Sequence, residues 1–265
     1  MKRKLIIVAL IVLVAMVVEM LMVKSLAAKE NQKIIVFSAM GLYEPVNEIC
    51  KQFEKESRIK VLCNFGNSKA LATQAINGYK FDIVLFANYE NMEELKTKGL
   101  ILSYDKFLKN HLVIIKNKKC KTSIKNINDL AKDSITIAVG DKSIPAGQYF
   151  YKSLDKSLKE KTISNKQKEK IEKNIKTREL TVRDILTKVL TSYVDVGVLY
   201  ETSELKTKYK NQIEVINLPE LKNTEAIFTI SISKKSLNNN NVKKLYKYLT
   251  QKNINTFIKY GFKMY

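Results

Sequence analysis

The sequence predicts an α/β protein, and two features support this class. Apolar runs of strand length alternate with segments whose apolar residues recur at helical spacing. Four of the strands are followed directly by residues that favour the start of a helix. Such alternation is typical of parallel sheets joined by right-handed crossovers. The chain has 265 residues, 45% of them apolar and 28% charged, and can therefore bury one large core or two small ones.

Three strand–helix pairs are predicted in the first part of the chain. In the first helix, Val46, Ile49 and Phe53 share one apolar face. The second and third helices stop at Gly78 and Gly99, because glycine is common directly after a helix. The three strands are expected at 34–39, 59–65 and 81–87.

The rest of the chain continues the alternation and contains no internal repeat. A basic stretch at 147–175 is predicted to be helical and exposed, with no function of its own. The other strands are expected at 112–116, 135–139, 194–200, 213–218 and 226–233, and the other helices at 126–132, 182–193, 203–209, 236–250 and 252–260.

Residues 1–27 have the composition of a signal peptide or an N-terminal membrane anchor. A basic start, fourteen apolar residues and a small-residue exit favour a signal peptide cleaved after Ala27 or Ala28. The alternative is an uncleaved anchor, since Leu5–Val23 is near spanning length, although Glu19 is costly in a bilayer. Both interpretations place the folded part of the chain outside the cytoplasm.

The net charge of +21 comes mostly from lysines spread along the chain. No nucleic-acid recognition motif and no arginine cluster accompanies it, so we expect no nucleic-acid partner. A positive field does favour the capture of a small anion.

The cysteines do not predict a metal site. Cys50, Cys63 and Cys120 are an odd number at irregular spacing, without the pairs that hold zinc and without a lipid-attachment position. A Cys50–Cys63 disulfide and buried free thiols both stay open, and free thiols are favoured.

The sequence does not predict an enzyme or a cofactor. His111 is the only histidine and no nucleophile motif accompanies it. Glycine-rich nucleotide motifs are absent. Asp82, at the start of a buried strand, is interpreted as a structural acid.

Four strand-to-helix turns remain as candidate ligand sites. The first N–H groups of a helix have no acceptor within the helix, and the helix dipole places positive charge there. Such helix starts bind anions readily, and in α/β sheets they lie at the carboxyl ends of strands. The four turns contain Gly41, the pair Asn67-Ser68 with Ser68 as N-cap, the run Pro145-Ala146-Gly147, and Thr181 as N-cap with Asp184 in a capping box.

Several segments resemble the molybdate-binding proteins of ABC importers, and the similarity extends over 33–262. They are GNSKALATQAINGYKFDIVLFA, GDKSIPAGQYFYKSL, TVRDILTKVLTSYVDVGVLYETS and the terminal KYGF. The resemblance implies a type II periplasmic-binding-protein fold, in which two α/β lobes close over a ligand cleft. The lobes would comprise 33–111 plus 227–265, and 112–226.

The resemblance also implies which residues bind the ligand. Such proteins hold molybdate or tungstate through hydroxyl and backbone N–H groups, without a metal or counter-charge. Ser68 and Tyr200 match the family's hydroxyl donors, and Ala146 and Val182 match its backbone donors. Gly41 stands where the family usually has a serine, so one hydroxyl is lost, at a cost of about 1.5–3 kcal/mol. We do not expect Ser38 to replace it.

The predicted function is therefore extracytoplasmic capture of molybdate or tungstate for an ABC permease, by a monomer and without catalysis. The alternatives are a binding protein or membrane-anchored sensor for another oxyanion, such as sulfate, thiosulfate or phosphate. An enzyme on the same bilobal fold is a third alternative.

Overall fold

The computed structural model describes residue 16, residues 18–19 and residues 33–265. The predicted signal or anchor segment, 1–27, thus lies almost entirely outside the described residues. Within the part of the chain that is described, no helix is both long and apolar enough to cross a bilayer.

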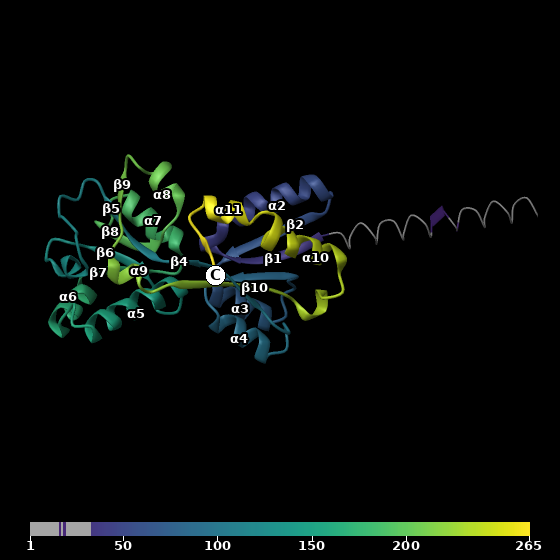
Figure 1. The fold of residues 1–265 in the computed structure, drawn as a ribbon, viewed down its shortest axis with the longest axis horizontal. Coiled ribbons are helices and arrows are strands. Elements are labelled where there is room, and N and C mark those ends of the chain that lie inside the picture. The colour runs from purple at the N-terminus through teal and green to yellow at the C-terminus, as the bar shows by residue number, and fades with distance from the viewer. Residues whose placement is uncertain (1–15, 17, 20–32) are drawn as a thin grey trace, which may run out of the picture.

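Residues 33–265 form two α/β lobes lying end to end, which confirms the predicted fold class (Figure 1). The first lobe is built on a six-stranded sheet in the order β11-β4-β10-β3-β1-β2. Strand β1 runs parallel to β2 and β3, whereas β10 is antiparallel to β3 and β4. The strands are β1 (Lys33–Ala39), β2 (Lys60–Gly66), β3 (Ile83–Phe86), β4 (Asp105–Asn110), β10 (Ala226–Ile232) and β11 (Lys263–Met264).

Helices cover both faces of this sheet because side chains alternate along its strands. Val36 belongs to the apolar cluster of α2, and the next residue, Phe37, belongs to the cluster of α3 and α4. The helical segments of this lobe are η1 (Met40–Leu42), α2 (Tyr43–Ser57), α3 (Ser68–Ile76), α4 (Glu90–Thr97), η3 (Lys234–Ser236), α10 (Asn240–Lys247), the π-helical turn η4 (Tyr248–Lys252) and α11 (Ile254–Lys259).

The second lobe is built on a five-stranded sheet in the order β7-β6-β8-β5-β9. Its strands are β5 (Leu112–Asn117), β6 (Ile137–Gly140), β7 (Ile175–Glu179), β8 (Val196–Tyr200) and β9 (Ile213–Ile216). Its helical segments are η2 (Ile127–Ala131), α5 (Pro145–Lys159), α6 (Asn165–Asn174), α7 (Val182–Leu190), α8 (Ser203–Thr207) and α9 (Pro219–Lys222).

The chain passes between the two sheets after β4 and again between β9 and β10. We retain 33–111 plus 227–265, and 112–226, as the proposed extents of the lobes.

The local structure differs from the sequence prediction in two ways. Strands β4 and β7 are not predicted, because their charged residues hide the apolar pattern of a strand, and the two-residue strand β11 is not predicted either. The basic stretch at 147–175 is two helices, not one. The chain turns at Lys161, where φ is 57°, and restarts at Ser164, whose hydroxyl accepts a hydrogen bond from the Gln167 N–H.

The cysteines are free in the structure. Cys50 on α2 is buried, and Cys63 on β2 and Cys120 are partly buried. The hydrogen bond with Cys63, together with burial, raises the pKa of the Cys50 thiol well above its usual value. The thiol is therefore protonated at neutral pH.

Candidate functional site

Four strand-to-helix connections meet in one small pocket between the lobes. All five predicted ligand residues, Gly41, Ser68, Ala146, Val182 and Tyr200, line it. Two come from the six-stranded lobe and three from the five-stranded lobe, so the pocket is complete only when the lobes are together. The other lining residues are Ala39, Met40, Gly66, Asn67, Ala87, Ile144, Pro145, Leu180 and Thr181.

Gly41 lies in the turn η1 and makes room for an aromatic ring. A Cβ atom at this position would lie 3.2 Å from Cδ2 of Tyr200, closer than ordinary van der Waals contact. The Tyr200 ring thus occupies the space that a serine side chain at position 41 would need. Ser38 does not line the pocket; it is fully buried and its hydroxyl donates to the carbonyl of Ala39 at 3.4 Å.

Ser68 supplies a hydroxyl group whose proton is available. Its Oγ accepts a hydrogen bond from the Ala87 N–H at 3.0 Å, and the side chain is buried. The N-cap of α3 is Asn67, not Ser68 as predicted: the Asn67 side chain accepts from the Ala70 N–H at 2.7 Å. Asparagine caps at least as well as serine, and this leaves Ser68 as the first helical residue, facing the pocket.

Ala146 is placed at the pocket by an unusually close contact between a strand end and a helix start. A Cβ atom on Gly147 would lie 2.0 Å from the carbonyl oxygen of Asp141, so only glycine fits there. A Cβ atom on Gly140 would lie 2.6 Å from the Gly147 nitrogen. Pro145 occupies the first position of α5, where it has no N–H to satisfy, and Ala146 follows it.

Val182 is the first residue of α7, and Thr181 is its N-cap as predicted. The Thr181 hydroxyl accepts from the Asp184 N–H at 3.2 Å and donates to the Asp184 carboxylate at 2.7 Å. The carboxylate thus bonds to the cap's hydroxyl instead of its backbone N–H, and the reciprocal capping box is incomplete. The N–H groups of Val182 and Arg183 precede the first capped position and have no acceptor within the helix.

Tyr200, at the end of β8, presents a buried hydroxyl to the pocket. Among the described residues this hydroxyl has no hydrogen-bond partner. A buried polar group without a partner is costly, which indicates a place for a ligand or water. Burial also raises the pKa of the Tyr200 hydroxyl well above its usual value. The group is therefore a hydrogen-bond donor throughout the physiological range.

The residues that line the pocket are all uncharged, although the molecule as a whole is strongly basic. Within the described part of the chain, acidic, histidine and cysteine side chains form no group that could hold a metal ion. Helix starts and two hydroxyl groups thus give a donor-rich site that suits an anion, and no catalytic acid–base pair lies among the lining residues.

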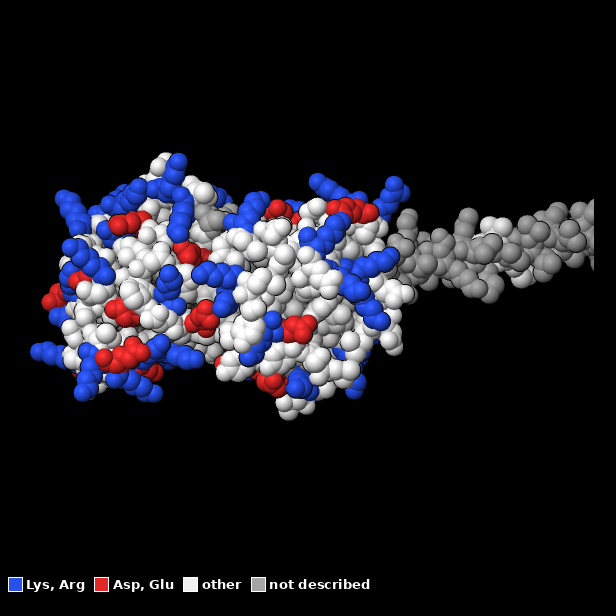
Figure 2. Space-filling view, in the orientation of Figure 1, with Lys and Arg blue, Asp and Glu red and all other residues white. Residues whose placement is uncertain are grey.

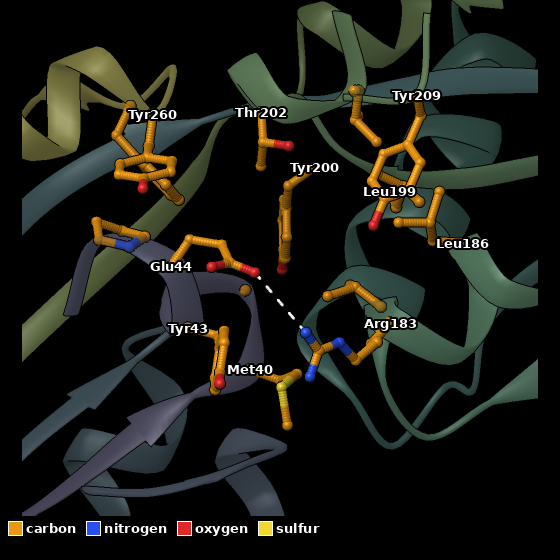
Figure 3. Close-up of a pocket in the computed structure, with 15 residues that line it drawn as sticks. Met40, Tyr43, Glu44, Arg183, Leu186, Leu199, Tyr200, Thr202, Tyr209 and Tyr260 are labelled. Carbon is orange, nitrogen blue, oxygen red and sulfur yellow. Dashed lines mark ion pairs between the residues drawn. The ribbon is translucent and has the colours of Figure 1, made fainter. Parts of the chain in front are cut away.

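A larger cavity of about 90 Å³ adjoins the pocket and shares Met40, Gly41, Val182 and Tyr200 with it. Its walls come from both lobes, and Tyr200 stands between α2 and α7 (Figure 3). Across this cavity the Arg183 guanidinium lies 3.7 Å from the Glu44 carboxylate. It also stacks 4.7 Å from the ring centroid of Tyr43.

His111 lies where the chain passes from β4 to β5. Its Nε2 atom is 3.2 Å from Oε2 of Glu201 and 3.1 Å from Oδ1 of Asn217. The neighbouring Asn110 amide donates to the Glu201 carbonyl at 2.8 Å. His111 thus joins the passage between the lobes to the ends of β8 and β9.

Sequence reasoning missed part of the pocket wall. Met40 and Leu180 line the pocket as apolar neighbours of the predicted turns, and Ala87 holds Ser68 in place through its backbone. No sequence signal marks these residues. Asn67 could have been identified, since it ranks with serine as an N-cap and directly precedes Ser68.

Comparison with known proteins places the chain among transport proteins. Residues 34–263 match the model of the family described as bacterial extracellular solute-binding protein. The molybdate-binding protein ModA of Escherichia coli is 28% identical over 251 residues, covering 89% of this chain and 91% of the relative. ModA of Mycobacterium tuberculosis is 26% identical over 207 residues, covering 77% and 74%.

Solved structures share the fold. The periplasmic molybdate-binding protein of Azotobacter vinelandii has a TM-score of 0.69 and 17% identity, covering 86% of this chain and 98% of its own. The sulfate-binding protein SubI of Mycobacterium tuberculosis has a TM-score of 0.73 and 13% identity, covering 87% and 86%. The fold is that of the periplasmic binding proteins, and the chain belongs to the bacterial extracellular solute-binding protein family.

Proposed function

We propose that this chain captures molybdate or tungstate in the pocket and delivers it to a membrane permease as a monomer. The observation that carries the proposal is the buried Tyr200 hydroxyl without a partner, in an uncharged pocket surrounded by helix starts. The relatives named as molybdate-binding support it, as does the presence of all five predicted ligand residues in the lining of one pocket.

The donors would come from both lobes. Ser68 and the N–H groups of the η1 turn at Gly41 belong to one lobe, and Tyr200 and the starts of α5 and α7 at Ala146 and Val182 belong to the other. An anion that accepts hydrogen bonds from both sides stabilises the closed arrangement over the open one. The chain then acts by binding and closure, without catalysis and without a cofactor.

A pocket that offers hydrogen-bond donors and no carboxylate acceptor favours a dianion that carries no proton. Each hydrogen bond to a charged group contributes about 1.5–3 kcal/mol, and helix starts add to the attraction. Phosphate at neutral pH carries a proton that needs an acceptor, and none of the lining side chains is a carboxylate. Sulfate has the same charge and shape as molybdate, so the size of the pocket would have to separate them.

Residues 1–27 would export the chain and be removed after Ala27 or Ala28, or would stay as an anchor. N-terminal sequencing of the protein from its native cells separates the two, because a start near Ala28 excludes the anchor and with it an anchored sensor.

Thermal unfolding with molybdate, tungstate, sulfate, thiosulfate and phosphate tests the ligand. A ligand at 100 times its Kd stabilises the folded state by about 2.7 kcal/mol. We expect the two larger oxyanions to raise Tm most. A larger shift with sulfate, thiosulfate or phosphate would assign the site to that anion, and no shift with any of them would contradict the proposal.

A further inference from the structure

A lysine-rich surface lies at the outer end of the six-stranded lobe. We define the lysine face as the exposed side chains of η3 and α10, and residues 234–247 contain no Asp or Glu. None of the ion pairs among the described residues involves these lysines, whereas nearby Lys252 pairs with Glu56. The members are Lys234, Lys235, Lys243, Lys244 and Lys247.

A longer lysine-rich segment, in the five-stranded lobe, also contains acidic residues. Residues 152–176 on α5 and α6 contain nine lysines but also four carboxylates. Three ion pairs neutralise part of that surface: Lys156–Glu160, Lys168–Asp155 and Lys170–Asp133. Positive charge is therefore less compensated on the lysine face than on α5 and α6.

Strand register places the lysine face at the end where the chain enters the lobe. Val36 of β1 pairs with Ile83 of β3, and Ile83 pairs with Ile232 at the end of β10. The residues after Ile232 thus lie at the end of the sheet where β1 starts, whereas Gly41 follows the other end of β1. Figure 2 shows basic side chains gathered at the end of the lobe where Figure 1 places α10.

The surface between these lysines is not flat. A groove at α10 is lined by partly buried Ile232 and Tyr246, with Lys243, Lys244 and Lys247 along it. Apolar floor and cationic rim together suit a headgroup layer, in which charged and apolar atoms are close together.

The sequence before β1 contains the candidate anchor, which would bring a bilayer close to this face. Leu5–Val23 is apolar except for Glu19, and only nine residues separate it from Lys33. Nine extended residues span about 30 Å, so a bilayer that holds Leu5–Val23 lies within reach of the lobe's outer end. We propose that, in the chain that keeps Leu5–Val23 as an anchor, the lysine face binds a bilayer surface containing anionic lipids, and so orients the lobe while the pocket stays at its far end.

Residue-resolved lysine acetylation tests this with the full chain. The protein is reconstituted in nanodiscs of phosphatidylcholine, with or without phosphatidylglycerol, and the acetylation rate of each lysine is measured by mass spectrometry. We expect the acetylation rates of Lys243, Lys244 and Lys247 in the anionic discs to be at most about one third of those in the neutral discs. Lys152 and Lys166 should react equally in both. High salt should remove the difference, because it shortens the Debye length.

Two triple variants with the same change in charge provide the control. In K243E/K244E/K247E, the remaining Lys234 and Lys235 should lose their protection; in K152E/K159E/K166E they should keep it. Equal rates for the lysine face in the two kinds of disc, or equal loss of protection in both variants, would overturn the proposal. The outcome does not depend on which oxyanion the pocket binds.

Discussion

At the residue scale, the buried Tyr200 hydroxyl lowers the stability of the ligand-free protein and provides a hydrogen-bond donor for the ligand. Its hydroxyl is buried without a partner among the described residues, so the ligand-free protein bears the cost of desolvating it. Tyr149, by contrast, accepts a hydrogen bond from the Ile227 N–H at 3.1 Å, and burial raises the pKa of its hydroxyl to about 12. Tyr149 can therefore serve as the control for substitutions of Tyr200, because both hydroxyls are buried and only that of Tyr149 has a hydrogen-bond partner.

We predict that Tyr200→Phe weakens molybdate binding about ten- to a hundredfold, because a donor to a charged ligand is lost. The ligand-free Tm should stay the same or rise, since an unpartnered hydroxyl is removed. Tyr149→Phe should instead lower Tm. Calorimetric titration and thermal unfolding measure both quantities, and a fall in the ligand-free Tm of Tyr200→Phe would contradict the account.

Gly41 controls the position of the Tyr200 ring. In Gly41→Ala the new Cβ atom would lie 3.2 Å from Tyr200 Cδ2, so the ring has to shift by a few tenths of an ångström. We expect the affinity for molybdate to fall about three- to tenfold as the hydroxyl moves away from its place. Gly66→Ala is the comparison within the same pocket lining, because its Cβ atom would contact Leu71 at an ordinary 3.5 Å and not the Tyr200 ring. Equal effects of both substitutions in the titration would rule out the ring contact as the cause.

At the scale of the elements, helix starts were predictable and polar strands were not. The start of α7 follows from Thr181, and that of α5 from Pro145, because caps and first-turn prolines are local signals. Strand β7, at the edge of its sheet, consists of IKTRE, and only tertiary pairing with β6 makes it a strand. The break at Lys161 depends on a left-handed residue that is not a glycine, which sequence patterns do not mark.

The contact of α2 with α7 predicts an effect on ligand release. Arg183 pairs with Glu44 and stacks on Tyr43 across the adjoining cavity, beside the pocket residue Val182. Because the pair is partly exposed, we expect Arg183→Gln to raise the dissociation rate only about two- to fivefold. Stopped-flow chase experiments measure this rate. Breaking the Lys69–Glu94 pair, which lies within one lobe, should leave it unchanged.

At the scale of the whole molecule, the passage between the lobes predicts an acid-sensitive stability. Burial raises the pKa of the Glu201 carboxyl, but the hydrogen bond with Lys206 and the charges of Lys206 and His111 lower it by more. The folded pKa is thus below the unfolded one. The stabilisation is complete above the usual glutamate pKa of about 4.3 and is lost as the pH falls through the lowered value.

We therefore expect Glu201→Gln to flatten the decline in unfolding free energy as the pH falls below about 5. Lys206→Met should have the same effect, because it removes the cation that lowers the pKa. Denaturant titrations across this pH range provide the measurement. A decline as steep in both variants as in the natural chain would show that this carboxylate does not contribute.

Five residues of the pocket lining could be predicted from the sequence, because each is tied to a local turn or strand end. What the sequence could not provide is the way the lobes meet. The contact of Gly41 with Tyr200 joins residues far apart in the chain, and the cavity beside it is formed by α2, α7 and the C-terminal residues around Tyr260. Contacts of this kind leave no periodic signal in the sequence.

The claim on which the account depends is that a doubly charged anion is held by uncharged donors alone. A crystal structure with tungstate, located by its anomalous scattering, tests it most directly. We predict one peak in the pocket, with Ser68 Oγ, Tyr200 Oη and the N–H groups of Ala146 and Val182 within hydrogen-bond distance. A peak outside this pocket, or one in contact with a lysine or a metal ion, would contradict the account.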